Sequence, residues 1–359
     1  MLSSRPRRTR HPLALAATLL LLLLCCGVTP KTAAEKPGPK VVVAWLDDAQ
    51  LGELRAAAPK ARLVPVESAE QAMKEIADAD ALLGVVNPEL IRAGKRLKWV
   101  QVYSAGVDRY RFPELKNSDI VLTNAKVIQG PNVADQALAL LLVLTRGIHR
   151  VVEQKPKRDW RGTRDALKKS KHRPIELHDK TALVVGLGGI GSAIAERARG
   201  FGMKIVAVDP KVDKKRADYI EEIVPPAKLK EVLPRADVLF LAVPLTNETQ
   251  GMIGAEEFAA LKPGAFIINI ARGKVIDTDA MVAALESGTL AGAGLDVTDP
   301  EPLPPEHPLW TFDNVVLTPH MGGTSDKVWE RRMELLRENL QHYVAGEPLR
   351  NVVDKQREY

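Results

Sequence analysis

Cysteine is nearly absent from this chain of 359 residues, and its two cysteines, Cys25 and Cys26, both lie near the amino terminus. The rest of the sequence therefore offers no thiol nucleophile, no disulfide and no cysteine-ligated metal. Histidine and carboxylate side chains are left to carry acid–base chemistry. We predict no metal site.

A large net charge is also missing once the amino terminus is set aside. The formal net charge is +6, but residues 1–34 contain five basic and no acidic residues, which leaves +1 for the remainder. A nearly neutral body gives no reason to propose nucleic acid as a partner. The length suits two domains, and the composition is typical of a globular protein.

Residues 1–34 have the pattern of a targeting segment. A basic stretch precedes the apolar run Leu13–Val28, which is shorter than the roughly twenty residues that cross a membrane comfortably. Thr32-Ala33-Ala34 resembles a signal-peptidase site, so cleavage would start the mature chain at Glu35. We expect export, to a periplasm or the cell exterior, if this leader is cleaved. An uncleaved leader would anchor the protein to a membrane by its amino terminus, and lipidation of a cysteine is a third alternative.

The stretch from Thr181 to Pro210 predicts a dinucleotide-binding βαβ unit. A short apolar strand is followed by the run GLGGIG, by apolar residues at helical spacing, by a second strand and by an acid. The glycines would allow a tight turn and a close approach to a pyrophosphate at the helix N-terminus, and the acid would bind the adenine ribose. A structural βαβ unit that binds nothing is the alternative. The predicted cofactor-binding residues are Gly186, Gly188, Gly189, Ile190, Gly191 and Asp209.

The sequence before residue 104 alternates short apolar strands with helices, which predicts a parallel sheet covered by helices. It contains no phosphate-binding fingerprint, and we interpret it as a flavodoxin-like half. Ser68 is expected to cap its helix. The expected strands are Val41–Leu46, Arg62–Val66, Ala81–Val86 and Lys98–Tyr103, and the expected helices are Asp48–Ala57, Ser68–Ala77 and Pro88–Ala93.

The second half predicts a doubly wound cofactor domain with six parallel strands. A closing amphipathic helix over Ser325–Ala345 is expected to return to the first half. The six strands are expected at Thr181–Val185, Lys204–Val208, Val238–Val243, Phe266–Ile270, Gly292–Val297 and Val315–Leu317.

Two segments lie between the halves. Asn132–Arg150 is apolar nearly all round, which predicts a buried helix, capped by Asn132, that links domains or subunits. Lys155–Arg173 is polar and basic. We interpret it as a solvated connection, with an anion-binding loop as the alternative.

Three polar residues follow strands of the cofactor domain, at the ends where ligands bind in such sheets: Arg272, Glu301 and His320. A guanidinium can bind a carboxylate or polarise a carbonyl, and a histidine can exchange a proton near neutral pH. A neighbouring carboxylate would hold the histidine in place. Each residue alone could be an ordinary surface or turn residue, but the three together favour catalysis.

The turn Ser104-Ala105-Gly106-Val107-Asp108 follows an expected strand of the first half. Small residues there leave backbone N–H groups available to bind an anion such as a substrate carboxylate. An ordinary connection between a strand and a helix is the alternative.

The chain resembles the D-isomer-specific 2-hydroxyacid dehydrogenase family over roughly residues 40–350, in particular its glyoxylate/hydroxypyruvate reductase-like branch. The stretches that carry the resemblance are VYSAGVDRY, GPNVADQALALLL, VVGLGGIG, VPLTNETQGMI, INIARGKVIDTDAMVAAL, GAGLDVTDPEPLPPEHPLW and NVVLTPHMGG. The resemblance implies that Arg272 binds the carboxylate and carbonyl of a 2-oxo acid. It implies that His320 is the proton donor and that Glu301 supports it.

The resemblance also implies the remaining contacts. The substrate carboxylate would be held at the turn formed by Ser104, Ala105 and Gly106. The nicotinamide amide would be held by Asp296 and the backbone near Ala271. Further cofactor contacts are implied for Pro244, Thr249 and His320.

The fold that the residues and the resemblance predict is α/β, with two doubly wound parallel-sheet domains. A Rossmann NAD-binding domain at 124–321 would be inserted in a flavodoxin-like substrate domain formed by 35–123 and 322–359. We expect a homodimeric, NAD-dependent reductase of a small 2-oxo acid. The alternatives are a non-catalytic NAD-binding co-regulator or scaffold, and a dehydrogenase of another small anion such as formate or phosphite.

Overall fold

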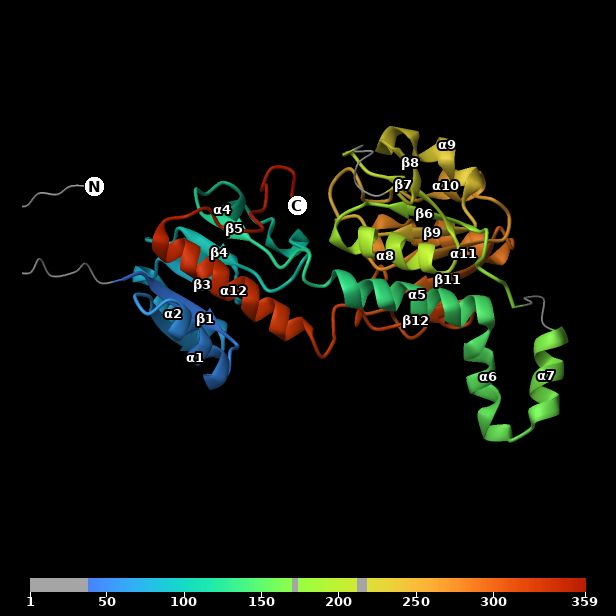
Figure 1. Ribbon diagram of the computed structural model, residues 1–359, viewed down its shortest axis with the longest axis horizontal. Helices are drawn as coiled ribbons and strands as arrows, with labels where there is room; N and C mark the ends of the chain where they lie inside the picture. Colours follow the sequence, from blue (N-terminus) through green and yellow to red (C-terminus); the bar gives the residue numbers. More distant parts are fainter. Residues whose placement is uncertain (1–37, 170–173, 212–217) are drawn as a thin grey trace, which may run out of the picture. The chain divides into compact units, whose positions relative to one another are not determined.

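A computed structural model describes residues 38–169, 174–211 and 218–359 and arranges their strands in two parallel β-sheets (Figure 1). The expected leader at 1–34 lies outside the described residues. Within them, no helix has the length and apolar character needed to span a membrane.

The first sheet has five strands in the order β2-β1-β3-β4-β5. This is the strand order of flavodoxin-like folds, as predicted. The sequence indicated four strands and missed β5, which has only three residues and one exposed position. The strands are β1 Lys40–Ala44, β2 Arg62–Val66, β3 Ala81–Leu83, β4 Trp99–Gln101 and β5 Val121–Thr123.

Helices cover both faces of this sheet because successive β1 residues point to opposite sides. Val41 and Val43 pack with α1 (Asp48–Ala57) and α12 (Val328–Ala345). The predicted return of the last helix to the first half is thus confirmed (Figure 1). The other face packs against α2 (Ala69–Glu75), α3 (Pro88–Ala93) and α4 (Pro113–Lys116). Ser68 caps α2 by accepting the Gln71 N–H, as expected.

The second sheet has seven strands in the order β12-β11-β10-β9-β6-β7-β8. The prediction of six strands was wrong because β8, with sequence IEEIV, has two exposed glutamates and no apolar run. It pairs with β7 at the edge of the sheet, where its glutamates remain in contact with water. The strands are β6 Thr181–Val185, β7 Lys204–Val208, β8 Ile220–Val224, β9 Val238–Leu241, β10 Ala265–Asn269, β11 Leu290–Leu295 and β12 Val315–Leu317.

This sheet is also covered on both faces, as a Rossmann-type sheet requires. One face packs against α5 (Gly130–Arg146) and α8 (Gly189–Gly200). The other packs against α9 (Leu229–Val232), α10 (Ala255–Ala260) and α11 (Thr278–Glu286). Short 3₁₀ helices lie at Ile76–Asp78, Asp108–Tyr110, Lys155–Lys157, Pro226–Lys228, Leu233–Arg235, Gly273–Val275 and Pro308–Trp310.

The segment between the halves differs from the prediction in three ways. The long helix is interrupted at Gly147, whose φ of 64° ends α5 before α6 (Ile148–Gln154) begins. Asn132 is inside α5 rather than its cap; its amide donates to the Gly322 carbonyl and accepts from Arg331. Much of the expected basic connection is helical, as α7 (Trp160–Lys169), whereas 170–173 lie outside the described residues.

Candidate active site

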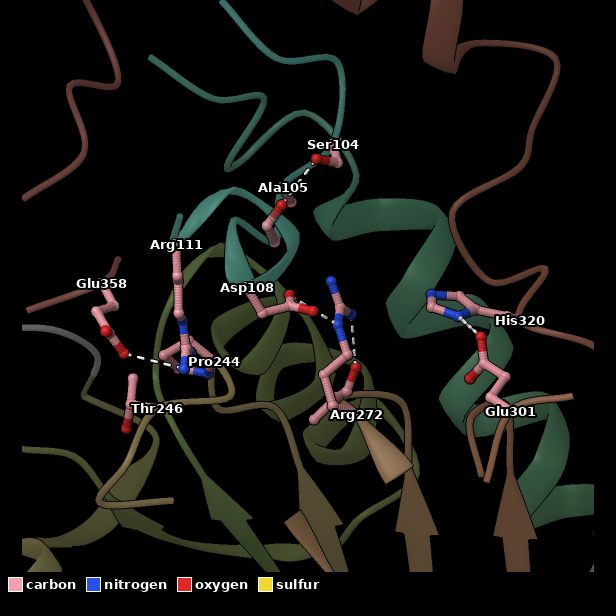
Figure 2. A network of polar contacts seen from close by, with 12 residues as sticks. Ser104, Ala105, Asp108, Arg111, Pro244, Thr246, Arg272, Glu301, His320 and Glu358 are labelled. Atoms are coloured by element: carbon pink, nitrogen blue, oxygen red, sulfur yellow. Dashed lines mark hydrogen bonds and ion pairs between the residues drawn. The ribbon is translucent and has the colours of Figure 1, made fainter. Parts of the chain in front are cut away.

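The three polar residues singled out in the sequence follow three strands that are neighbours in the sheet. Arg272 follows β10, Glu301 follows β11 and His320 follows β12. Because these strands are parallel, their carboxyl ends lie at one edge, where open α/β sheets bind ligands. Figure 2 shows the three side chains gathered there.

His320 and Glu301 are in direct contact, with 2.8 Å between Nδ1 and Oε1. A carboxylate only accepts hydrogen bonds, so Nδ1 carries a proton and donates a hydrogen bond to Glu301. Nε2 is then the nitrogen left to exchange a proton with a substrate. Figure 2 shows the imidazole pointing from Glu301 toward the guanidinium of Arg272.

The backbone of His320 adopts a left-handed conformation, with φ of 51°, that is uncommon for residues with a side chain. Asp296 holds it there, because its backbone carbonyl accepts the His320 N–H at 2.8 Å. The buried carboxylate of Asp296 accepts three more bonds from the same loop, donated by Thr318 Oγ1 and the N–H groups of Met321 and Gly322. Asp296 therefore fixes the proton-exchanging residue, whereas its predicted contact with the nicotinamide stays a prediction.

Arg272 is oriented by two acceptors. Its Nε donates to Asp108 Oδ1 at 3.0 Å, and its Nη1 donates to the Ala271 carbonyl at 2.8 Å. Asp108 was inside a stretch noted in the sequence, but no role was predicted for it. An acid four residues after the turn's first residue was the available signal, although nothing in the sequence links it to an arginine 164 positions later.

The remaining guanidinium nitrogen of Arg272 lies against the turn formed by Ser104, Ala105 and Gly106. A Cβ built on Gly106 would lie 1.8 Å from Arg272 Nη2, so this approach requires glycine. The turn is held by Ser104 Oγ, which donates to the Gly106 carbonyl, and by Asn124, which donates to the Ala105 carbonyl. Within the described residues, the N–H groups of Ala105 and Gly106 donate to no protein acceptor. The guanidinium thus lies against a turn with two available amides, an arrangement that suits a carboxylate.

The glycine run connects β6 to α8 in the way a dinucleotide site requires. A Cβ on Gly191 would lie 1.7 Å from the Gly186 carbonyl oxygen, so only glycine allows this close helix–strand packing. A Cβ on Gly188 would meet nothing within 4 Å, so the backbone there faces open space. Gly189 and Ile190 begin α8, and no side chain caps that end. These residues fit a dinucleotide whose pyrophosphate lies at the helix N-terminus.

Asp209 follows β7 at the position expected for the ribose-binding acid. The residue is buried, with Oδ2 accepting the Leu187 N–H at 2.7 Å and Oδ1 accepting the Lys211 N–H at 2.9 Å. The carboxylate therefore also orders the glycine turn, because Leu187 lies within it.

Pro244 and Thr249 are brought together in one turn after β9, the strand next to β6. Thr249 Oγ1 donates to the Pro244 carbonyl at 2.6 Å and accepts the Thr246 N–H at 2.8 Å. Figure 2 shows Arg111, which is ion-paired with Glu358, reaching toward this turn. In the described residues, no group of three or more His, Cys, Asp and Glu side chains could hold a metal ion.

Comparison with known proteins gives the class of this protein. Residues 138–322 match the model of the D-isomer specific 2-hydroxyacid dehydrogenase, NAD binding domain. The chain is 36% identical to the glyoxylate reductase of Korarchaeum cryptofilum over 79% of this chain and 85% of that protein.

Two solved structures extend the comparison to the whole fold. The holo form of Rhodotorula graminis D-mandelate dehydrogenase has a TM-score of 0.78 and 27% identity, over 89% of this chain and 98% of that one. The NADPH-dependent glyoxylate/hydroxypyruvate reductase of Sinorhizobium meliloti, in complex with NADP and sulfate, has a TM-score of 0.73 and 27% identity, over 90% and 100%.

The chain belongs to the D-isomer specific 2-hydroxyacid dehydrogenase family. The predicted fold class and the predicted oxidoreductase class, acting on a CH–OH group with NAD or NADP, are thereby confirmed.

Proposed function

We propose that this protein reduces small 2-oxo acids, of the size of glyoxylate and hydroxypyruvate, to D-2-hydroxy acids. The observation that carries the proposal is the close approach of Arg272 Nη2 to the turn that holds two available amides, at the sheet edge that also holds the His320–Glu301 pair. The resemblance to proteins named glyoxylate reductase supports this substrate size.

The residues divide the chemistry between them. Arg272 and the amides of Ala105 and Gly106 bind the substrate carboxylate, which turns the 2-oxo group toward the imidazole. His320 gives the proton from Nε2 to the carbonyl oxygen, while Glu301 stabilises the imidazolium and keeps its orientation. The bound nicotinamide supplies the hydride in this chemistry.

We propose NAD(H) as the preferred cofactor. A buried carboxylate at Asp209 would accept hydrogen bonds from a 2′-hydroxyl but repel a 2′-phosphate. Structures similar to this chain were solved with NADP or NADPH, which makes NADPH the competing cofactor.

The test is the oxidation of NADH by the purified protein with a panel of 2-oxo acids, followed at 340 nm. We expect turnover of glyoxylate and hydroxypyruvate. Arg272→Lys is the informative variant, because lysine keeps the charge but loses the planar guanidinium that grips a carboxylate. We expect it to raise KM and lower kcat for the 2-oxo acid with cofactor affinity little changed. Turnover of formate or phosphite instead would refute the proposed substrate class.

Two further proposals concern the whole molecule. We propose a homodimer through the region of the apolar helix α5, which size-exclusion chromatography with light scattering would test.

We also propose that residues 1–34 are a cleaved export signal, supported by their basic and apolar pattern. Sequencing the amino terminus of the natural protein should then find Glu35, whereas an intact Met1 on mature protein would contradict cleavage.

A further inference from the structure

A cluster of three aromatic rings and one arginine lies at the carboxyl edge of the five-stranded sheet. Trp45 follows β1, Tyr103 follows β4, and Trp329 and Arg332 belong to the first turns of α12. We call these four residues the aromatic cluster. Tyr103 is central to it, with ring centroids 6.4 Å from Trp45 and 6.1 Å from Trp329, both edge-on.

Arg332 contributes a positive charge that no carboxylate among the described residues pairs with. Its guanidinium carbon lies 4.2 Å from the Trp329 ring centroid and 5.6 Å from that of Tyr103. Its Nε is buried and has no hydrogen-bond partner. Burial lowers the pKa of Arg332 from its ordinary value, and only Tyr103 among the described residues opposes this shift. Stacking on two rings offsets part of the cost of burying a cation, but it does not satisfy the Nε–H donor.

The cluster is open to solvent on the side of its two tryptophans. Trp45 is 53% exposed and Trp329 is 38% exposed, which is unusual for the largest apolar side chain. Trp45 is nevertheless held in place, because its Nε1 donates to the Glu67 carbonyl at 3.0 Å. Exposed aromatic surface at the carboxyl edge of a sheet marks a place where a ligand can bind.

The chain connects this cluster directly to both halves of the active site. Tyr103 immediately precedes the turn Ser104–Gly106, and Gly106 lies against Arg272 Nη2. In the other direction, His320 lies in the loop that leads from β12 to α12, which carries Trp329 and Arg332. Tyr103 therefore joins the aromatic cluster to the turn that is proposed to hold the substrate carboxylate.

We propose that Arg332 binds a second carboxylate at the distal end of the substrate, with Trp45 and Trp329 flanking the carbon chain between. This inference rests on the proposed function and extends its substrates to 2-oxo diacids of low molecular weight. Two guanidinium groups then divide the recognition. Arg272 binds the carboxylate next to the reacting carbon, and Arg332 binds the distal carboxylate.

The experiment compares kcat/KM for 2-oxoglutarate with that for 5-methyl-2-oxohexanoate, which has nearly the same shape but a neutral isopropyl group in place of the distal carboxylate. A charge-assisted hydrogen bond corresponds to a preference of about 10- to 100-fold for the diacid. Arg332→Met should bring this ratio close to one, and Arg332→Lys should keep part of it. Arg337→Met, five residues further along the same helix at a 44% exposed side chain, is the matched control and should keep the ratio.

Other outcomes are equally decisive. A wild-type ratio near one, or a ratio that Arg332→Met leaves intact in a folded protein with normal NADH binding, overturns the inference while reduction of glyoxylate leaves the proposed function standing. If Arg332→Met does not fold, the wild-type ratio and Arg332→Lys decide.

If no 2-oxo acid is reduced, the proposed function fails, and the binding site can still be tested with glutarate. Saturable quenching of tryptophan fluorescence by glutarate, lost in the Arg332 variants, supports anion binding at the aromatic cluster. Unchanged fluorescence refutes it.

Discussion

Asp108 and Arg272 form an ion pair with 3.0 Å between Oδ1 and Nε. The pair joins a 3₁₀ helix between β4 and β5 of the five-stranded sheet to a turn that follows β10 of the seven-stranded sheet. Both side chains are mostly buried, at 18% and 27% exposed, so water screens the contact less than it would on an open surface. By accepting from Nε, Asp108 directs the Nη2 edge of the guanidinium toward Gly106.

Asp108→Asn should therefore lower the catalytic efficiency for the 2-oxo acid while the protein still folds. The amide preserves the shape but removes the charge that orients Arg272, and we expect kcat/KM for glyoxylate to fall about 10- to 100-fold. Steady-state kinetics and NADH titration would separate this from cofactor binding, which should be unchanged. Asp108→Glu should recover part of the loss, whereas unaltered kinetics in Asp108→Asn would remove the residue from the site.

His320→Asn should lower kcat by the factor typical of a general acid, about 10²–10⁴. Glu301→Gln should have a smaller effect, because the amide can still contact Nδ1 but cannot stabilise an imidazolium. Since Glu301 acts through His320, the double variant should be no slower than His320→Asn alone. Additive losses in the double variant would show that Glu301 has an independent role.

Gly106→Ala tests the close approach between the turn and Arg272. The added methyl would lie 1.8 Å from Nη2, so the flexible guanidinium must move away from the amides that share its ligand. We expect a large loss of kcat/KM with little change in the melting temperature. Gly52→Ala is the matched control, because its Cβ would meet nothing within 4 Å and alanine favours the helix α1. Full activity of Gly106→Ala would place the carboxylate elsewhere.

Asp209→Ala should narrow the preference for NADH over NADPH. The variant loses hydrogen bonds to the ribose and also loses the repulsion of a 2′-phosphate, which is worth on the order of a hundredfold in preference. Because Asp209 also accepts the Leu187 N–H, affinity for both cofactors should fall. The measurement is kcat/KM for each cofactor with one 2-oxo acid. Equal use of NADPH by the wild type would assign the choice to basic residues after β7, of which Lys211 is described and Lys214, Lys215 and Arg216 are not.

Local chemistry explains which parts of the fold could be predicted. The glycine run and Asp209 act within about thirty residues, so their spacing alone indicated a βαβ unit. Strand β8 was missed because an edge strand keeps its glutamates in water and shows no apolar run. Asn132 was misread as a cap because its real partners, Gly322 and Arg331, are distant in sequence.

The same distinction applies to the site. Arg272, Glu301 and His320 each follow a recognisable strand, so their common edge could be expected. The partnership of Asp108 with Arg272 and the stacking of Arg332 on Tyr103 depend on side-chain directions. No periodicity in the sequence encodes such directions.

The packing of α12 on the first sheet also governs the order in which this protein can fold during synthesis. Met333, Leu336 and Leu340 cover Val41, Val43 and Leu54, so one core is assembled from opposite ends of the chain. A nascent chain that emerges amino terminus first must leave that apolar face uncovered until α12 has left the ribosome. The seven-stranded sheet is formed by one continuous stretch and is free of this constraint. Its cofactor site can thus fold before α12 has been added to the substrate-binding sheet. During that interval, the apolar surface of β1 and α1 is the part of the chain that a chaperone would bind.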